Sequence, residues 1–469
     1  MATSPNRAIR FRAFASVGGG ALPLNSGQVV GRIGLPSQAS VNVDYNSVGR
    51  VDELAPFRVW CELGKAQHTL FEGQLTHIGR DKHERNRSIT LTGTGFSGTW
   101  FRTTLHQVNE LSPSGYSYGD KIRARAVGDP VGYTAGKRFA DLSNLNQGDL
   151  PGFIKSVLAR AAGTSGLGSI ALSKVTILSD AAVTALYTNG GMAWRMFLKL
   201  VEGQTSSTSP VMTYLQSIMD LLYYEMVDMV GPAPGGRILF KPKTFFAPVP
   251  GANVFLPQNY GFFRESRSLV DAPTRMMFQT NAFLEPTPAG GIDITTLVRF
   301  APAALQSAFD ALNRNGDTGA FAKTLSSPIT PEEGRRGVIA EYGALSPAEW
   351  VIASSAGGVA ADAALGKIAE YKLRLKQLEY RSATVNHCFA PQVAVGFPGV
   401  VVDDKFNIRG LVSGVSHSFS VDGVSTNISL SHTRFDGEGG EASNPPWVSD
   451  EYSSGSAYNS LLGSGPTGF

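Results

Sequence analysis

The chain has 469 residues, of which 42% are hydrophobic, so it is long enough for about three domains with sizeable cores. Its 41 basic and 38 acidic residues nearly balance, which argues against a dedicated nucleic-acid binder with a clustered basic surface. Glycine and proline together stay below the share of about 25–30% that marks disorder, so we expect a folded, turn-rich and largely β protein.

The first part of the chain, 1–105, reads as short strands. Residues 57–63 alternate between polar and apolar, 69–78 are strand-like, and 87–93 place Ile89 and Leu91 on one face, with a charged turn at 80–87. We predict a small antiparallel β-barrel here. Cys61 lies on the apolar face of its strand, which favours a buried free thiol.

Residues 106–244 change character and predict a mixed α/β middle region. The segment 150–162 reads as a helix, and a second helix is expected from Pro210, with Ser209 as its cap. The apolar run 211–230 is interrupted by three acidic residues, so we expect a buried core helix rather than a membrane span. A strand is expected at 237–241.

Residues 245–435 predict a second β-barrel with a helical insertion at about 300–384. The clearest helix is 362–381, where apolar residues recur every three or four positions. Two alternating runs that flank Asp422-Gly423 then predict a closing hairpin with a type I′ turn. In that register Val421 faces Val424, and His417 faces Ile428. The fold class predicted for the whole chain is therefore mainly β with α+β insertions.

The last segment, 436–469, is an extended tail rich in glycine, serine and proline. Such a composition builds no core, so we expect it to be unstructured in the free subunit. Its aromatic residues Trp447, Tyr452 and Tyr458 are of the kind that dominate interfaces, and we expect them to order against a neighbouring subunit.

Motifs that would indicate chemistry are weak, so we predict no catalytic residue, cofactor or metal. Gly93–Gly98 matches a dinucleotide-binding glycine pattern but follows a strand of alternating polarity, which favours a plain turn. Ser117 sits in a G-x-S-x-G string that no apolar strand precedes. The seven histidines are scattered without metal-ligand spacing, and no signal peptide is expected.

Four stretches resemble the tail baseplate hub proteins of bacteriophages. The first comprises 388–403 with the strand 410–421, and the second is 248–257 followed by Ser266-Arg267 and Ala272-Pro-Thr-Arg275. The third is 331–338, and the fourth is the helix 362–381. Ala252 and Ala272 stand where the family pattern has cysteine and glutamate. The resemblance covers 245–435 well and 1–100 loosely.

The resemblance implies a structural protein of the virion tail baseplate, assembled in the host cytoplasm. It implies a homotrimer in which each chain gives two similar barrels, the blocks 1–100 and 385–435. The resulting pseudo-six-fold ring would join the tail tube protein to the three-fold central spike protein, contact other baseplate proteins and pass DNA through its lumen. The alternative is a carbohydrate-binding or glycan-hydrolysing β protein of a tail tip.

Overall fold

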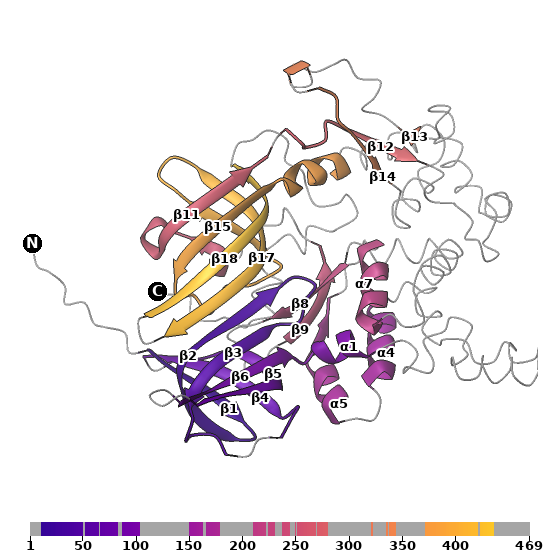
Figure 1. Cartoon of the computed structure of the whole chain (residues 1–469). Helices are drawn as coiled ribbons and strands as arrows, with labels where there is room; N and C mark the ends of the chain where they lie inside the picture. Colours follow the sequence, from indigo (N-terminus) through magenta and orange to yellow (C-terminus); the bar gives the residue numbers. More distant parts are fainter. Residues whose placement is uncertain are drawn as a thin grey trace, which may run out of the picture.

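The computed structural model describes residues 11–49, 52–64, 66–82, 87–103, 150–162, 166–178, 210–221, 224–229, 237–243, 249, 251–268, 270–279, 320–321, 334–335, 337–343, 371–420 and 423–435. Most of the described strands belong to one 12-stranded sheet, and two three-stranded sheets accompany it. The protein is mainly β with α+β insertions, as the sequence predicts (Figure 1).

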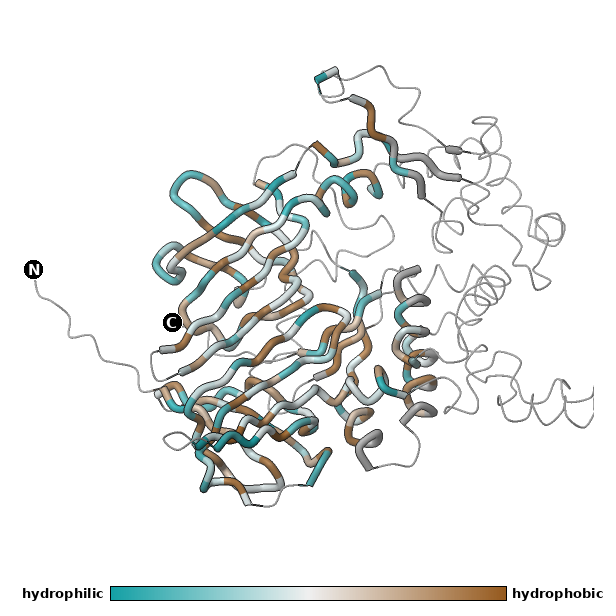
Figure 2. Tube along the Cα trace, in the orientation of Figure 1, coloured by the Kyte–Doolittle hydropathy of each residue, from teal (hydrophilic) through white to brown (hydrophobic). Residues whose placement is uncertain are grey.

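Six strands of the N-terminal block form a closed antiparallel barrel. Hydrogen bonding follows the order β1-β4-β5-β6-β3-β2, and a further pairing of β1 with β2 closes the ring. The strands are β1 (Phe11–Val17), β2 (Gly20–Arg32), β3 (Gln38–Asp44), β4 (Pro56–Leu63), β5 (Ala66–Lys82) and β6 (Arg87–Gly95). Alternate residues, among them Val41, Val59 and Leu91, fill one core. Figure 2 shows the corresponding alternation of hydropathy along the strands. The predicted first barrel is present.

A second group of six strands curls around its own core. The order is β10-β16-β17-β18-β15-β11, and the strands are β10 (Val254–Phe255), β11 (Tyr260–Arg267), β15 (Arg381–Cys388), β16 (Pro398–Val402), β17 (Asn407–Ser420) and β18 (Gly423–Phe435). Short 3-10 turns, η2 (Gly251–Asn253) and η3 (Pro257–Asn259), flank β10. The Tyr260 hydroxyl donates to the Val402 carbonyl at 3.0 Å and links β11, at one end of this sheet, to β16 near the other end.

Within the described residues, a three-stranded sheet and four helices form the middle layer, beside the barrels in Figure 1. The sheet order is β7 (Val175–Ile177), β9 (Arg237–Pro242) and β8 (Tyr224–Met229). The helices are α1 (Gly98–Arg102), α4 (Leu150–Ala162), α5 (Gly166–Ser173) and α7 (Val211–Leu221). The expected helix 150–162 and the strand at 237–241 are confirmed, and the second helix begins at Val211, one residue after the expected start at Pro210; its expected cap, Ser209, lies outside the described residues.

The expectation of one core helix across the run 211–230 is wrong. Helix α7 ends at Leu221, and β8 follows as a strand in which every residue from Tyr224 to Met229 is buried. Because β8 is buried on both faces, it lacks the alternation of a half-buried strand, so periodicity does not separate it from a buried helix.

The predicted helix 362–381 runs past its observed end. Residues 371–379 are helical, whereas Arg381 opens β15 and pairs with Arg267 of β11; residues 362–370 lie outside the described part. The remaining sheet is small: β12 (Arg275–Gln279) pairs with β13 (Ala320–Phe321) and, in parallel, with β14 (Ala340–Gly343).

Candidate assembly interface

The two barrels share one strand topology. When the six strands of each barrel are numbered in chain order, both follow the sequence first, fourth, fifth, sixth, third, second. The main departure is at the first strand, because the two-residue β10 runs parallel to β16 whereas β1 runs antiparallel to β4. A shared order of six strands points to an internal duplication, so the barrels can be compared position by position.

A β-bulge occupies the same place in both barrels. It interrupts the pairing of the fifth and sixth strands, which are β5 with β6 in one barrel and β17 with β18 in the other. The bulged residues are Thr76 and Ser413. Each hydroxyl donates to a carbonyl oxygen of the facing strand, Thr76 to Thr92 and Ser413 to Ser429, both at 3.1 Å. The bulge therefore fixes the alignment of β5 with β17.

The turn that enters the fourth strand is also duplicated. It carries a residue with positive φ, which is Leu54 (62°) in the first barrel and Gly396 (82°) in the second. The same two backbone hydrogen bonds surround it. They are Leu54 to Leu75 and Leu75 to Ala55 in one barrel, and Gly396 to Val412 and Val412 to Phe397 in the other. The two turns therefore share a positive φ at the same position and the same two backbone hydrogen bonds.

The third strands carry a short repeat that the sequence analysis missed. Ala39-Ser-Val-Asn42 of β3 and Ala383-Thr-Val-Asn386 of β15 occupy the same register. Asn42 accepts a hydrogen bond from Thr90 at 2.8 Å, and Asn386 donates one to Asn427 at 2.7 Å, each to the neighbouring sixth strand. Three of the four residues are identical, so a comparison of short segments between 1–100 and 381–435 would have found this signal.

One strand pair joins the barrels into a single sheet. Residues 27–32 of β2 run antiparallel to residues 414–419 of β17, from Gly27 opposite Phe419 to Arg32 opposite Gly414. Phe419 is buried in the core of the first barrel although its strand belongs to the second. On the outer face Gln28 donates to the Ser416 hydroxyl at 2.8 Å. We call this pairing the barrel joint.

The closing hairpin that forms the joint is present, but its register differs from the predicted one. Ser420 faces Gly423, so His417 faces Thr426 rather than Ile428. A shift by two residues keeps every side chain on its predicted face, because the strand repeat is two. Gly423 begins β18 with a φ of 147°, whereas Asp422 lies outside the described residues.

Strand β8 lies between the barrels and contacts each of them with one face. The buried Asp228 accepts hydrogen bonds from the Ser37 amide at 3.1 Å and the Ser97 hydroxyl at 2.6 Å, both beside the first barrel. Burial raises the pKa of Asp228, and these hydrogen bonds oppose the shift.

On the opposite face of β8, Glu225 forms a buried ion pair with Lys241, and the Lys241 ammonium lies 5.0 Å from the ring centre of Phe397 in the second barrel. A buried charge without a partner is costly, so the ion pair of Glu225 with Lys241 favours this arrangement of the second barrel against β8.

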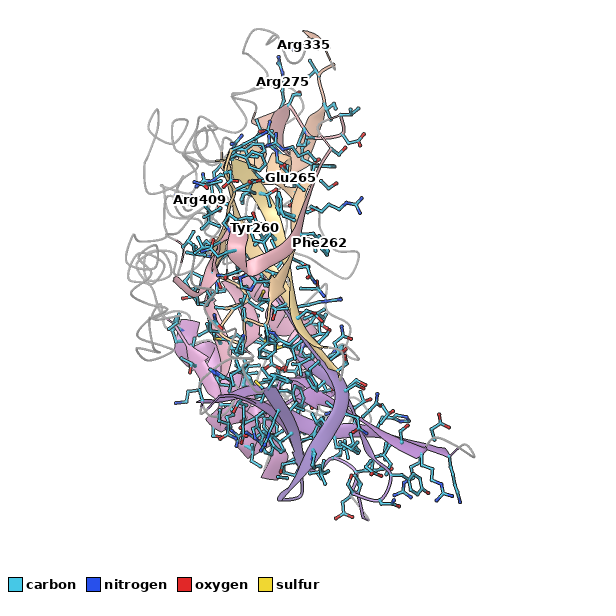
Figure 3. All side chains as sticks on the ribbon, turned by 90° about the vertical axis from the view of Figure 1, so that its left-hand side faces the viewer. Tyr260, Phe262, Glu265, Arg275, Arg335 and Arg409 are labelled. Atoms are coloured by element: carbon cyan, nitrogen blue, oxygen red, sulfur yellow. The ribbon has the colours of Figure 1, made fainter. Side chains whose placement is uncertain are left out.

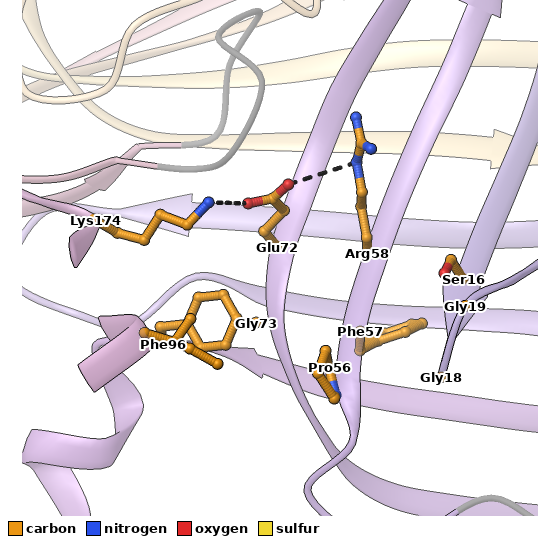
Figure 4. Close-up of a pocket in the computed structure, with 11 residues that line it drawn as sticks. Ser16, Gly18, Gly19, Pro56, Phe57, Arg58, Glu72, Gly73, Phe96 and Lys174 are labelled. Carbon is orange, nitrogen blue, oxygen red and sulfur yellow. Dashed lines mark hydrogen bonds and ion pairs between the residues drawn. The ribbon is translucent and has the colours of Figure 1, made fainter. Parts of the chain in front are cut away.

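A hollow of about 530 Å³ opens on the first barrel near α5 (Figure 4). Glu72 lies in it between two cations, 3.0 Å from Lys174 and 3.5 Å from Arg58. Glu72 is the one carboxylate among its lining residues, and glycoside hydrolysis ordinarily uses two.

The remaining residues singled out in the sequence are scattered. Cys61 is a buried free thiol, and burial raises its pKa to about 12, which makes it inert. The glycine string 93–98 spans the end of β6 and the start of α1, within an antiparallel barrel. Ser117 and the tail residues Trp447, Tyr452 and Tyr458 lie outside the described residues. Within the described part, no cluster of histidine, cysteine or carboxylate side chains is arranged to hold a metal ion.

Comparisons with known proteins give likenesses of fold. No family model matches the chain, and no curated protein sequence does. A 43 kDa tail protein of prophage MuSo2 from Shewanella oneidensis is 8% identical, with a TM-score of 0.48 over 90% of this chain and 97% of that one. A tail protein from Neisseria meningitidis is 11% identical, with a TM-score of 0.44 over 90% and 96%. At these scores the likenesses do not by themselves assign a function. No helix among the described residues is long and apolar enough to cross a membrane.

Proposed function

We propose that this chain is the structural hub of a phage tail baseplate. Three copies form a ring that joins the six-fold tail tube to the three-fold central spike, and DNA passes through its lumen during ejection. The partners are the tube protein, the spike protein and other baseplate proteins, and the location is the virion tail, after assembly in the host cytoplasm.

The observation that carries this proposal is the duplicated barrel. Two barrels with one strand order, one bulge and one turn give six similar units in a trimer. Such a ring offers the same surface six times to a six-fold partner. Features that the chain carries once, such as the middle layer with β8, occur three times and suit a three-fold partner. The hub-like motifs of 245–435 support the same function.

The chain's charge supports a role in which DNA passes without being held. The formal net charge is +3 over 469 residues, whereas stable DNA binding depends on many phosphate contacts from clustered lysine and arginine. We propose no catalytic activity. A sugar-binding or hydrolytic activity of the purified chain, lost in a single carboxylate variant, would favour the tail-tip carbohydrate protein instead.

The tail 436–469 is proposed to contact a neighbouring subunit through Trp447, Tyr452 and Tyr458. Truncation before Gly437 should leave the melting temperature of the subunit unchanged and weaken its assembly. Loss of folding after truncation would show that the tail belongs to a core of its own subunit.

The proposed assembly state is tested by the mass of the full chain in solution. Native mass spectrometry should give three times the 49.8 kDa subunit mass at assembly concentrations. A closed dimer would contradict the proposal, because a two-fold pair of chains gives four barrels and matches neither a tube nor a spike.

A further inference from the structure

Several strands of the described part have a hydrogen-bond partner on one side only, and two of these edges belong to the second or the fifth strand of a barrel. The first is β11, whose ladder is with β15 alone. The second is the end of β5, residues 77–82, which pairs with β6 but extends beyond the last residue of the β4 ladder. Unpaired strand edges are ready templates for another strand, and natural proteins usually cover them. In Figure 3, Tyr260, Phe262 and Glu265 mark β11 at the front of the second barrel.

Because the barrels are duplicated, each of the two edges can be matched to a strand of the other barrel. In the barrel joint, the second strand of one barrel pairs with the fifth strand of the other, β2 with β17. The second strand of the second barrel is β11, and the fifth strand of the first barrel is β5. The two open edges are therefore the counterparts of the two edges that meet in the joint. Within one chain β2 pairs with β17 in this way, whereas the corresponding strands β11 and β5 do not pair with each other.

We propose that β11 of one copy pairs antiparallel with β5 of the next copy, in the register of the barrel joint. The bulges fix the alignment: Thr76 corresponds to Ser413, and Gly261 of β11 corresponds to Asn25 of β2. The intersubunit ladder then runs from Phe263 opposite Lys82 to Ser268 opposite His77. This inference rests on the proposed function, because it states how three copies close a ring of six barrels.

Charge complementarity supports this register. It sets the exposed Arg264 opposite the exposed Asp81, and it sets Glu265, which is ion-paired with Arg267 of its own strand, opposite the exposed Arg80. Two opposite-charge pairs thus face each other in adjacent positions, whereas a slip by one residue would bring Arg264 opposite Arg80. Facing strands are stabilised by opposite charges and destabilised by like charges. The register was derived from the bulges alone, so the charges are an independent observation.

The apolar contact of the joint has a counterpart as well. In the joint the Phe419 ring covers Gly27, whose added Cβ would lie 2.6 Å from that ring. In the proposed ladder the aromatic residue is on the other strand, since Phe263 replaces Gly27 and Lys82 replaces Phe419. A lysine stem can pack along a ring and its ammonium is attracted to the ring face. One aromatic residue per strand pair is therefore kept.

A contact between two different edges is heterologous, so each copy offers one edge of each kind to its two neighbours. The ring closes when the rotation between copies is twice the rotation between barrels. No additional patch is needed.

The ladder is tested by disulfide trapping in the full chain. In a Cys388→Ser background, Ser266→Cys combined with Gly79→Cys places two thiols opposite each other, at a separation that a disulfide spans. Gly79 accepts a Cβ at an ordinary 3.6 Å contact. Mild oxidation should give covalent dimers and trimers of the chain. The matched pair Ser266→Cys with Lys82→Cys is out of register by three residues and should give none.

Charge exchange provides a second test that needs no oxidation. Arg264→Asp and Asp81→Arg should each weaken trimer association by about tenfold, and the double variant should restore it. Lys405→Glu reverses an exposed charge outside the ladder and should change nothing. The absence of crosslinks, or a double variant no better than the single ones, overturns the ladder. A trimer of correct mass without crosslinks would overturn the ladder alone and leave the hub function standing.

Discussion

At the scale of single residues, His417 occupies the barrel joint as a buried, neutral imidazole. Its Nδ1 lies 3.0 Å from the Thr426 hydroxyl, and that hydroxyl accepts a hydrogen bond from the Ala390 amide at 2.9 Å. The other ring nitrogen, Nε2, has no hydrogen-bond partner among the described residues. Burial lowers the pKa of His417 to about 4.

Stability should therefore depend on pH through His417. The unfolded chain binds a proton near pH 6.5 and the folded chain only near pH 4, so stability is complete above pH 6.5 and falls as the pH drops toward 4. His417→Gln should remove about 3 kcal/mol of that loss. His432, whose pKa is also about 4, keeps part of the slope in the variant. Melting temperatures of the wild type and of His417→Gln at about pH 7.5, 5.5 and 4.5 provide the measurement. An equal dependence of the melting temperature on pH in the two proteins would contradict the assignment.

Gly423 should matter for its backbone and not for its space. A Cβ at Gly423 meets nothing within 4 Å, but its φ of 147° is one that side chains rarely adopt. Gly423→Val should cost about 1–3 kcal/mol. Gly20→Val is the matched control, because Gly20 opens β2, has the same free space and lies outside that φ region. A thermal melt in which both variants equal the wild type would refute the strain.

At the scale of elements, the joint depends on the close approach of β2 to the Phe419 ring. A Cβ at Gly27 would lie 2.6 Å from that ring and 2.8 Å from Val41. Gly27→Ala should destabilise the protein by about 1–3 kcal/mol through overpacking. Gly20→Ala, on the same strand with free space, should be neutral in the same denaturant titration. A neutral Gly27→Ala would mean that the joint repacks freely.

Strand and helix positions in the first barrel, α4 and the closing hairpin follow from periodicity in the sequence. The predicted face of each strand residue is correct because alternation is set by local polarity. The predicted register of the hairpin is wrong, since a two-residue shift leaves every side chain on the same face and the pattern gives no preference between the two registers. Strand β8 was missed because Tyr224–Met229 is buried on both faces, and its acidic residues meet partners from distant elements such as Ser97 and Lys241.

At the scale of the whole molecule, the duplication organises the protein. The duplication is hard to detect in the sequence because few residues are identical at equivalent positions of the two barrels. Asn42 with Asn386 and Gly73 with Gly410 are two of the identical pairs. The bulge and the turn keep their backbone geometry with different side chains, whereas the close approach at Gly73 and Gly410 keeps the residue itself. The other positions need only alternate between polar and apolar, which many sequences do.

The central claim is that this chain forms an axial ring of six barrels from three copies. A reconstruction of the assembled tail by electron microscopy tests it most directly. We predict three copies around the tail axis, in a ring that lies between the tube and the spike. The barrels of 11–95 and of 254–435 should alternate around this ring. Copies at strict six-fold or twelve-fold positions away from the axis would contradict the account.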